Sequence, residues 1–207
     1  MSFSRSFTMT VTALMAVGYV VGMATAVADE PVSISPSKID SLMLTGEDVK
    51  SYGIDFVETI SDSAVPAWDT PEPGDFCMAA RSLTLMNSAD ALRRVAFDSR
   101  SNYQVVQAVG VFSSPDEAKA TVDRYADNAN KCVMKDKQYF RASDGPRVTW
   151  SYPTADVSGE FVGNQAAWEV QAVDNVVVLG SSSRFDNGPV LAEKIAGALA
   201  QKVRDAG

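Results

Sequence analysis

The sequence predicts a single α+β domain in which helices pack on one face of an antiparallel β-sheet. Three observations support this fold class. Residues 104–112 form an apolar run typical of a central strand, residues 168–180 read as a hairpin, and amphipathic segments follow Pro115 and Pro189. Hairpins together with separately grouped helices are typical of α+β domains. With 207 residues, 46% of them hydrophobic and 21% charged, the chain has a globular composition.

Residues 1–28 have the composition of a secretory signal peptide. Arg5 precedes an uncharged stretch, and the segment Ala26–Ala28 matches the small-x-small pattern of a cleavage site. We therefore expect cleavage after Ala28, secretion or retention in the cell envelope, and no stable membrane insertion of the mature protein. The alternative is an N-terminal membrane anchor, because the 23 uncharged residues that end at Ala28 could span a bilayer. No cysteine lies near this site, which argues against a lipoprotein.

The rest of the chain divides into a flexible lead-in over residues 29–38 and a single domain over residues 39–207. Apolar positions after Ile39 indicate a pair of short helices, the second of which we expect Thr45 to cap. Residues 61–75 contain three prolines and a glycine around Trp68, which predicts a loop.

Four further segments predict strands. Residues 93–98 form a weak candidate, whereas residues 104–112 are apolar on both faces and indicate a central strand. Val148, Trp150 and Tyr152 alternate along the next candidate. Residues 168–180 form a hairpin around Asp174-Asn175, a pair that tolerates the positive φ of a type I′ turn.

Two long helices complete the predicted fold. Ser114 and Glu117 form a capping box around Pro115, and the helix that follows has one apolar face that ends at Cys132. A second amphipathic helix begins near Pro189 and runs toward the end of the chain.

Cys77 and Cys132 are the only two cysteines in the chain. In a protein exported to an oxidising compartment such a pair predicts a disulfide. The alternative, a redox-active dithiol, is typical of closely spaced CxxC cysteines, and these two are far apart in the sequence.

The composition argues against several function classes. The chain has no histidine, so a Ser-His-Asp triad, a Cys-His pair and a His-based zinc site are excluded. The net charge of −8 argues against nucleic-acid binding, which depends on Lys and Arg contacts to phosphates. No DxDxDG-like calcium loop is present, and no pattern brings two particular carboxylates together. We therefore expect a non-enzymatic protein without cofactor or metal.

Several segments resemble the extracellular sensor domain of the actinobacterial PknH-type kinases, a domain that also occurs alone in secreted proteins and lipoproteins. The similar segments are residues 42–50, 75–77, 105–118, 130–132 and 174–178, followed by the alanine-rich terminal helix. The resemblance covers residues 39–203 and contains no catalytic motif.

This resemblance implies an α+β domain with an open cleft for an extracellular ligand, and two disulfides. The second pair would fall near residues 168–183, where this chain has no cysteine. We therefore expect a secreted, sensor-like domain that binds a small extracellular or cell-wall ligand in a cleft. The alternative is a protein–protein interaction module that docks another envelope protein through its acidic surface or an exposed edge strand.

Aromatic and arginine side chains are the candidate ligand contacts, because binding clefts combine apolar walls with a few polar groups. The candidate residues are Trp68, Trp150, Tyr152, Trp168 and Arg141. For Trp150, Tyr152 and Trp168 the alternative is a place in the core of the sheet. Arg93, Arg94, Arg141 and Arg147 could receive an anion, and the alternative for them is a surface ion pair.

Overall fold

The computed structural model describes residues 33–54, 58–63, 74–98, 104–135, 140–144, 147–155, 161–183 and 188–207. The predicted signal peptide and Trp68 lie outside these residues. The elements are, in order, α1 (Ile39–Leu42), α2 (Gly46–Lys50), β1 (Glu58–Ser63), α3 (Phe76–Arg81), β2 (Ala91–Asp98), β3 (Gln104–Val111), α4 (Pro115–Lys135), β4 (Phe140–Asp144), β5 (Arg147–Ala155), β6 (Phe161–Val173), β7 (Val176–Ser182) and α5 (Gly188–Ala206). Short 3₁₀ turns lie at Pro36–Lys38 and Leu83–Met86.

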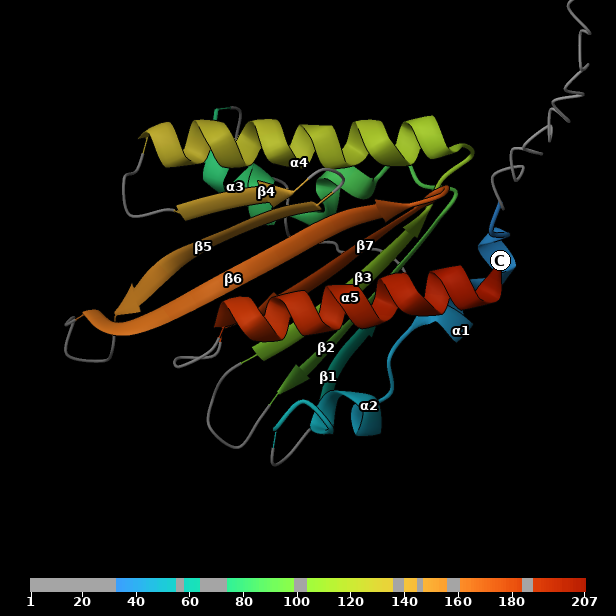
Figure 1. The fold of residues 1–207 in the computed structure, drawn as a ribbon, viewed down its shortest axis with the longest axis horizontal. Helices are drawn as coiled ribbons and strands as arrows, with labels where there is room; N and C mark the ends of the chain where they lie inside the picture. The colour runs from blue at the N-terminus through green and yellow to red at the C-terminus, as the bar shows by residue number, and fades with distance from the viewer. Residues whose placement is uncertain are drawn as a thin grey trace, which may run out of the picture. The chain divides into compact units, whose positions relative to one another are not determined.

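The strands form one antiparallel sheet in the order β1-β2-β3-β7-β6-β5-β4 (Figure 1). The predicted strands are confirmed, and β3 lies between β2 and β7, as its apolar faces indicated. The sequence pattern did not reveal β1 and β4, the two ends of the strand order. Both are short and of mixed composition, because edge strands carry charged residues and bury fewer side chains than central strands.

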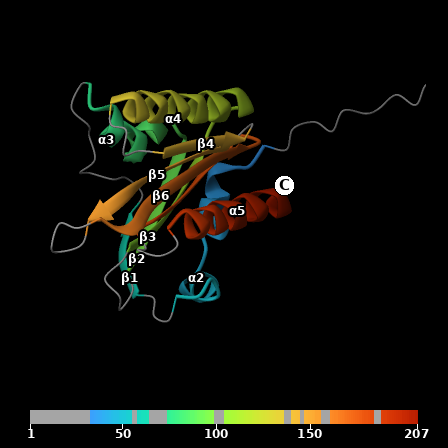
Figure 2. The ribbon, with the colours of Figure 1, turned by 60° about the vertical axis from the view of Figure 1, so that its left-hand side comes forward.

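Helices cover both faces of the sheet rather than the single face that we predicted (Figures 1 and 2). Along β3 and β7, alternate residues enter two separate cores: Val109 and Val178 face α5, whereas Ala108 and Leu179 face α4. A central strand that is apolar on both faces requires a cover on each face. The same observation that placed residues 104–112 in the centre therefore also accounts for the second helical layer.

The turn between β6 and β7 differs from the predicted type I′ turn. Of its two central residues only Asp174 has a positive φ, 50°, and a type I′ turn requires two. Asn175 is buried, its Oδ1 accepts a hydrogen bond from the Ile34 amide, and its Nδ2 donates to the carbonyls of Ile34 and Phe112. These long-range bonds hold Asn175 toward the core.

The chain joins the fold before the predicted domain boundary at residue 39. Ile34 is 2% exposed, lies in the core under α5 and is bonded to Asn175 through both of its backbone polar groups. Residues 34–38 therefore belong to the folded domain. The predicted cap of α2 is confirmed, because Thr45 and Asp48 form a reciprocal capping box.

Gly180 of β7 lies directly under α5, which predicts a large effect for its replacement. A Cβ at Gly180 would be 2.5 Å from the Ala192 carbonyl oxygen and 2.7 Å from the Ala196 amide nitrogen, both backbone atoms. We expect Gly180→Ala to lower the free energy of unfolding by about 2 kcal/mol or more, since overpacking displaces α5. Urea denaturation measures this change.

Gly197, in α5 itself, is the matched control for Gly180. A Cβ there meets nothing within 4 Å, so Gly197→Ala should raise the free energy of unfolding by about 0.5–1 kcal/mol. A Gly180→Ala variant as stable as the wild type would contradict the close packing of α5 on β7.

Candidate functional site

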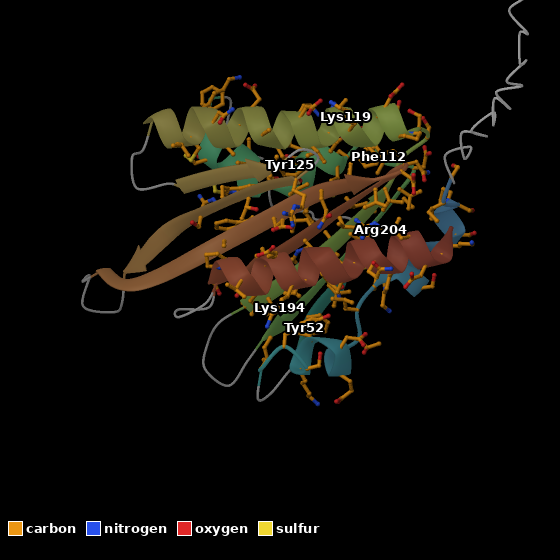
Figure 3. All side chains as sticks on the ribbon, in the orientation of Figure 1. Tyr52, Phe112, Lys119, Tyr125, Lys194 and Arg204 are labelled. Atoms are coloured by element: carbon orange, nitrogen blue, oxygen red, sulfur yellow. A yellow bond between two sulfur atoms is a disulfide. The ribbon has the colours of Figure 1, made fainter. Side chains whose placement is uncertain are left out.

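Helix α3 lies over the same sheet face as α4 and is fixed at both ends. At its start, Cys77 forms a disulfide with Cys132 of α4, with the two Cα atoms 4.8 Å apart, which confirms the predicted pair. At its end, the buried Tyr125 hydroxyl of α4 donates a hydrogen bond of 2.8 Å to the Ser82 carbonyl. Figure 3 shows Tyr125 between α4 and the sheet. The position of α3 is thus set by α4.

A cleft of about 260 Å³ opens between α3 and the sheet. From α3 and the residues after it come Met78, Arg81, Ser82 and Leu83. From β2 and β3 come Arg94, Gln104 and Val106, and from β6, β7 and the residue after β7 come Ala166, Trp168, Leu179 and Ser181–Ser183. The volume is somewhat below the roughly 300–1,000 Å³ of pockets for drug-sized ligands. The cleft therefore suits a small molecule.

One wall of the cleft is the end of an aromatic stack that begins in the core. The ring centroids of Tyr125 and Trp150 are 5.9 Å apart, and those of Trp150 and Trp168 are 6.1 Å apart with an angle of 11° between the planes. The guanidinium carbon of Arg81 lies 5.8 Å from the centroid of the Trp168 ring, within cation–π range. The buried rings thus hold both Trp168 and Arg81 at the cleft.

The charged side chains in the described lining of the cleft are arginines, whereas the chain as a whole is acidic. This described lining carries Arg81 and Arg94 but no aspartate or glutamate, and it includes several serines. The chain as a whole has a net charge of −8. A positive, hydroxyl-lined cleft on an acidic protein favours a ligand that accepts hydrogen bonds or is negatively charged.

Of the predicted ligand contacts, the structure places Trp168 in the cleft. Trp150 is 1% exposed and belongs to the core beneath it. Arg141 lies in β4 opposite Trp150, and Tyr152 lies in β5 opposite Ala166, but their side chains are outside the described part, as is Trp68. These three residues remain predictions.

Three of the four arginines of the sequence prediction have described side chains, and these three lie in different places. Arg94 lines the cleft, whereas Arg93 extends from the other face of β2, with Nε 3.4 Å from an Asp40 carboxylate oxygen. Arg147 lies near Glu169 and Glu193 on the α5 side.

Sequence reasoning missed Arg81 and the Ser181–Ser183 run as cleft residues. Three serines directly after an apolar strand were the available signal for the latter. Arg81 had none, because the position of α3 depends on contacts with distant segments, among them the disulfide to α4 and the hydrogen bond from Tyr125.

The cleft and the point where the chain enters the fold lie at opposite ends of β3. Gln104, at the start of β3, lines the cleft and exchanges hydrogen bonds with Ser183. Ile34 is held beside Phe112, at the other end, through Asn175. Eight residues of strand separate these ends by about 25 Å.

The α5 face holds a second cluster of polar groups, around the carboxylate of Glu169. This carboxylate is 3% exposed, accepts a hydrogen bond from Thr149 at 3.2 Å and lies 3.9 Å from the Arg147 guanidinium. Burial raises the pKa of Glu169 above its ordinary value, although the Thr149 hydrogen bond and Arg147 act in the opposite direction. A raised pKa is typical of catalytic acids, but the Glu169 side chain is almost fully covered by the protein.

The raised pKa of Glu169 predicts a pH-dependent stability. In the interval between the ordinary glutamate pKa and the raised value, the folded protein binds more protons than the unfolded chain, so stability falls as the pH rises and stays lower above the interval. A glutamine at this position does not titrate. As the pH rises through the interval, Glu169→Gln should therefore become more stable relative to the wild type. Urea denaturation of both proteins at a series of pH values measures the difference.

Glu193 lies 3.5 Å from the same Arg147 guanidinium but is 58% exposed, and its charge helps to raise the pKa of Glu169. In Glu193→Gln the stability should therefore fall less with rising pH over this interval than in the wild type. Parallel stability curves for the wild type and Glu169→Gln would contradict the titration of Glu169 in this range.

Within the described ranges, no group of three His, Cys, Asp or Glu side chains is arranged to hold a metal ion. Among the helices in these ranges, none has both the length and the apolar composition needed to cross a bilayer.

Comparisons with known proteins agree with this architecture. The sequence model of the PknH-like extracellular domain matches residues 34–202. The crystal structure of the extracellular domain of PknH from Mycobacterium tuberculosis superposes with a TM-score of 0.69 at 18% identity, covering 85% of this chain and 100% of that one. At this identity the structural match shows the shared fold. No curated protein matches the sequence.

Proposed function

The chain belongs to the PknH-like extracellular domain family, and on that premise we propose that it is a sensor-like domain that binds a small extracellular or cell-wall ligand. The ligand would occupy the cleft between α3 and the sheet, without chemical conversion. The observation that carries the proposal is this cleft itself. Helix α3, on one side of the cleft, is attached to α4 by the disulfide, and Trp168, on the other side, is held by stacked aromatic rings. Such preorganisation favours binding, because little ordering is required when a ligand enters.

We further propose that the protein is exported and that its signal peptide is cleaved after Ala28. The extracellular family, the pattern at Ala26–Ala28 and the disulfide support this proposal. The alternative of an N-terminal membrane anchor remains compatible with ligand binding, because the chain enters the fold at the end of β3 that is remote from the cleft.

A native mass spectrum of the protein secreted by its own host tests ligand binding and cleavage together. We expect the mass of residues 29–207 with an intact disulfide, plus a small adduct. Val106 is half-buried and lines the cleft, so Val106→Phe should fill the cleft and remove the adduct. Val190→Phe on the exposed side of α5, where Val190 is 44% exposed, should keep it. A bare wild-type chain, or an adduct that persists in Val106→Phe, would contradict the proposal.

A protein–protein interaction module is the second candidate function. It is favoured by the position of β1 and β4 at the two ends of the strand order and by the net charge of −8. An added strand from a partner could extend such an edge. Detection of the secreted chain only within a heavier assembly would favour this candidate.

A further inference from the structure

We propose that the cleft selects small molecules that combine an oxyanion, either a carboxylate or a phosphate, with an apolar body. This inference rests on the proposed function, because it names the chemical class of ligand for the same cleft. It follows from the way in which two guanidinium groups and the apolar walls are arranged.

Arg81 supplies a guanidinium whose orientation is already fixed. Its guanidinium carbon lies 5.8 Å from the centroid of the Trp168 ring, and its Nε donates a hydrogen bond of 3.2 Å to the Cys77 carbonyl. Its Nη2 lies 3.1 Å from the Met78 sulfur. These contacts fix the position of a planar guanidinium at the cleft, a group whose N–H donors match the geometry of carboxylate and phosphate oxygens.

Arg94 supplies the second positive charge, from the sheet side of the same cleft. It belongs to β2, opposite the small Ala108 of β3, and is only 6% exposed. Charge attraction is stronger in such a water-poor environment than at the surface. An anion between α3 and β2 would therefore lie near both guanidinium groups of the described lining.

The rest of the cleft is apolar or carries hydroxyl groups. Val106, Leu179 and Ala166 line its sheet side, and Ser181 adds a hydroxyl that can donate to an oxyanion. These residues come from the three central strands β3, β7 and β6. They provide an apolar surface for the remainder of the ligand, next to the charged groups.

An NMR titration with three probes tests the inference on the full-length, ¹⁵N-labelled protein. Benzoate combines a carboxylate with an apolar ring, benzamide is its neutral counterpart of the same shape, and acetate is an anion with almost no apolar body. We expect benzoate to shift the Trp168 indole N–H signal saturably and to bind about 10- to 100-fold more tightly than benzamide, the usual range for a hydrogen bond between charged groups. Acetate should bind more weakly than benzoate.

Substitutions identify the charges responsible. Arg81→Gln should weaken benzoate binding about 10- to 100-fold and should weaken benzamide binding much less. Arg81→Lys, which retains the charge without the planar fork, should lie between the wild type and Arg81→Gln. Arg93→Gln is the matched control, because Arg93 adjoins Arg94 in β2 but faces Asp40 on the opposite side of the sheet. The spectrum itself shows whether each variant is folded.

Three results would overturn the inference: no saturable shift with benzoate, equal affinity for benzoate and benzamide, or an equal loss in Arg93→Gln and Arg81→Gln. These results are distinguishable from failure of the proposed function. A neutral native adduct that Val106→Phe removes would overturn oxyanion selectivity and leave ligand binding standing. A bare native chain that binds neither benzoate nor benzamide would overturn both.

Discussion

Removing the disulfide between Cys77 and Cys132 is expected to lower the free energy of unfolding by about 4 kcal/mol in the chain-entropy description. The bond closes a loop between residues that are 55 positions apart. Without the bond the unfolded chain has a higher conformational entropy, which favours unfolding. Urea denaturation of the double variant Cys77→Ala/Cys132→Ala measures the loss. Wild-type protein treated with a reducing agent should show a similar loss, which separates the cross-link from the alanine substitutions.

The loss of this disulfide should also destabilise helix α3, which borders the cleft. Helix α3 has only six residues, Phe76–Arg81, too few to be stable as an isolated helix. Without the bond, amide hydrogen exchange in α3 should accelerate more than exchange in β3 or β7. A double variant with wild-type stability, or uniform acceleration across the domain, would contradict the role of the disulfide in fixing α3.

Replacing Trp150 by alanine is expected to cost about 3–5 kcal/mol of folding free energy, the range for large aromatic residues in a core. Its side chain is 1% exposed and stacks between Tyr125 and Trp168. Its loss would leave a cavity under the cleft wall and remove both ring contacts. Urea denaturation followed by far-UV circular dichroism measures this change without relying on tryptophan fluorescence.

Trp150→Phe is the control for this prediction. Among the described residues, the Trp150 indole N–H has no hydrogen-bond partner, so phenylalanine retains an aromatic ring and removes no hydrogen bond. This variant should lose clearly less stability than Trp150→Ala. Trp150→Ala within about 1 kcal/mol of the wild type would contradict its placement in the core, since only surface changes are usually that small. Ligand binding is better tested at Trp168, which lines the cleft directly.

Local sequence patterns were sufficient to place most of the longer helices and strands and the cap of α2. Apolar patterns located α4, α5 and the inner strands β3, β5, β6 and β7, and gave the fifth inner strand, β2, as a weak candidate, because helices and strands bury side chains at different repeats. Two cysteines allow only one pairing within the chain, so the disulfide was predictable as well. Thr45 could be assigned as a cap because its bonding partner Asp48 lies three residues away.

Only the tertiary structure decided which residues meet in the cleft. Arg81, Arg94 and Trp168 come from three elements, α3, β2 and the distant strand β6, and they converge because of the strand order and because α3 is attached to α4. Arg93 and Arg94 face opposite sides of the sheet because successive side chains alternate along a strand, and it is the packing of α3 on one side that places Arg94 in the cleft. A sequence pattern gives the spacing of apolar residues within one segment. Strand order, register and the face that packs against a given helix arise from contacts between distant segments.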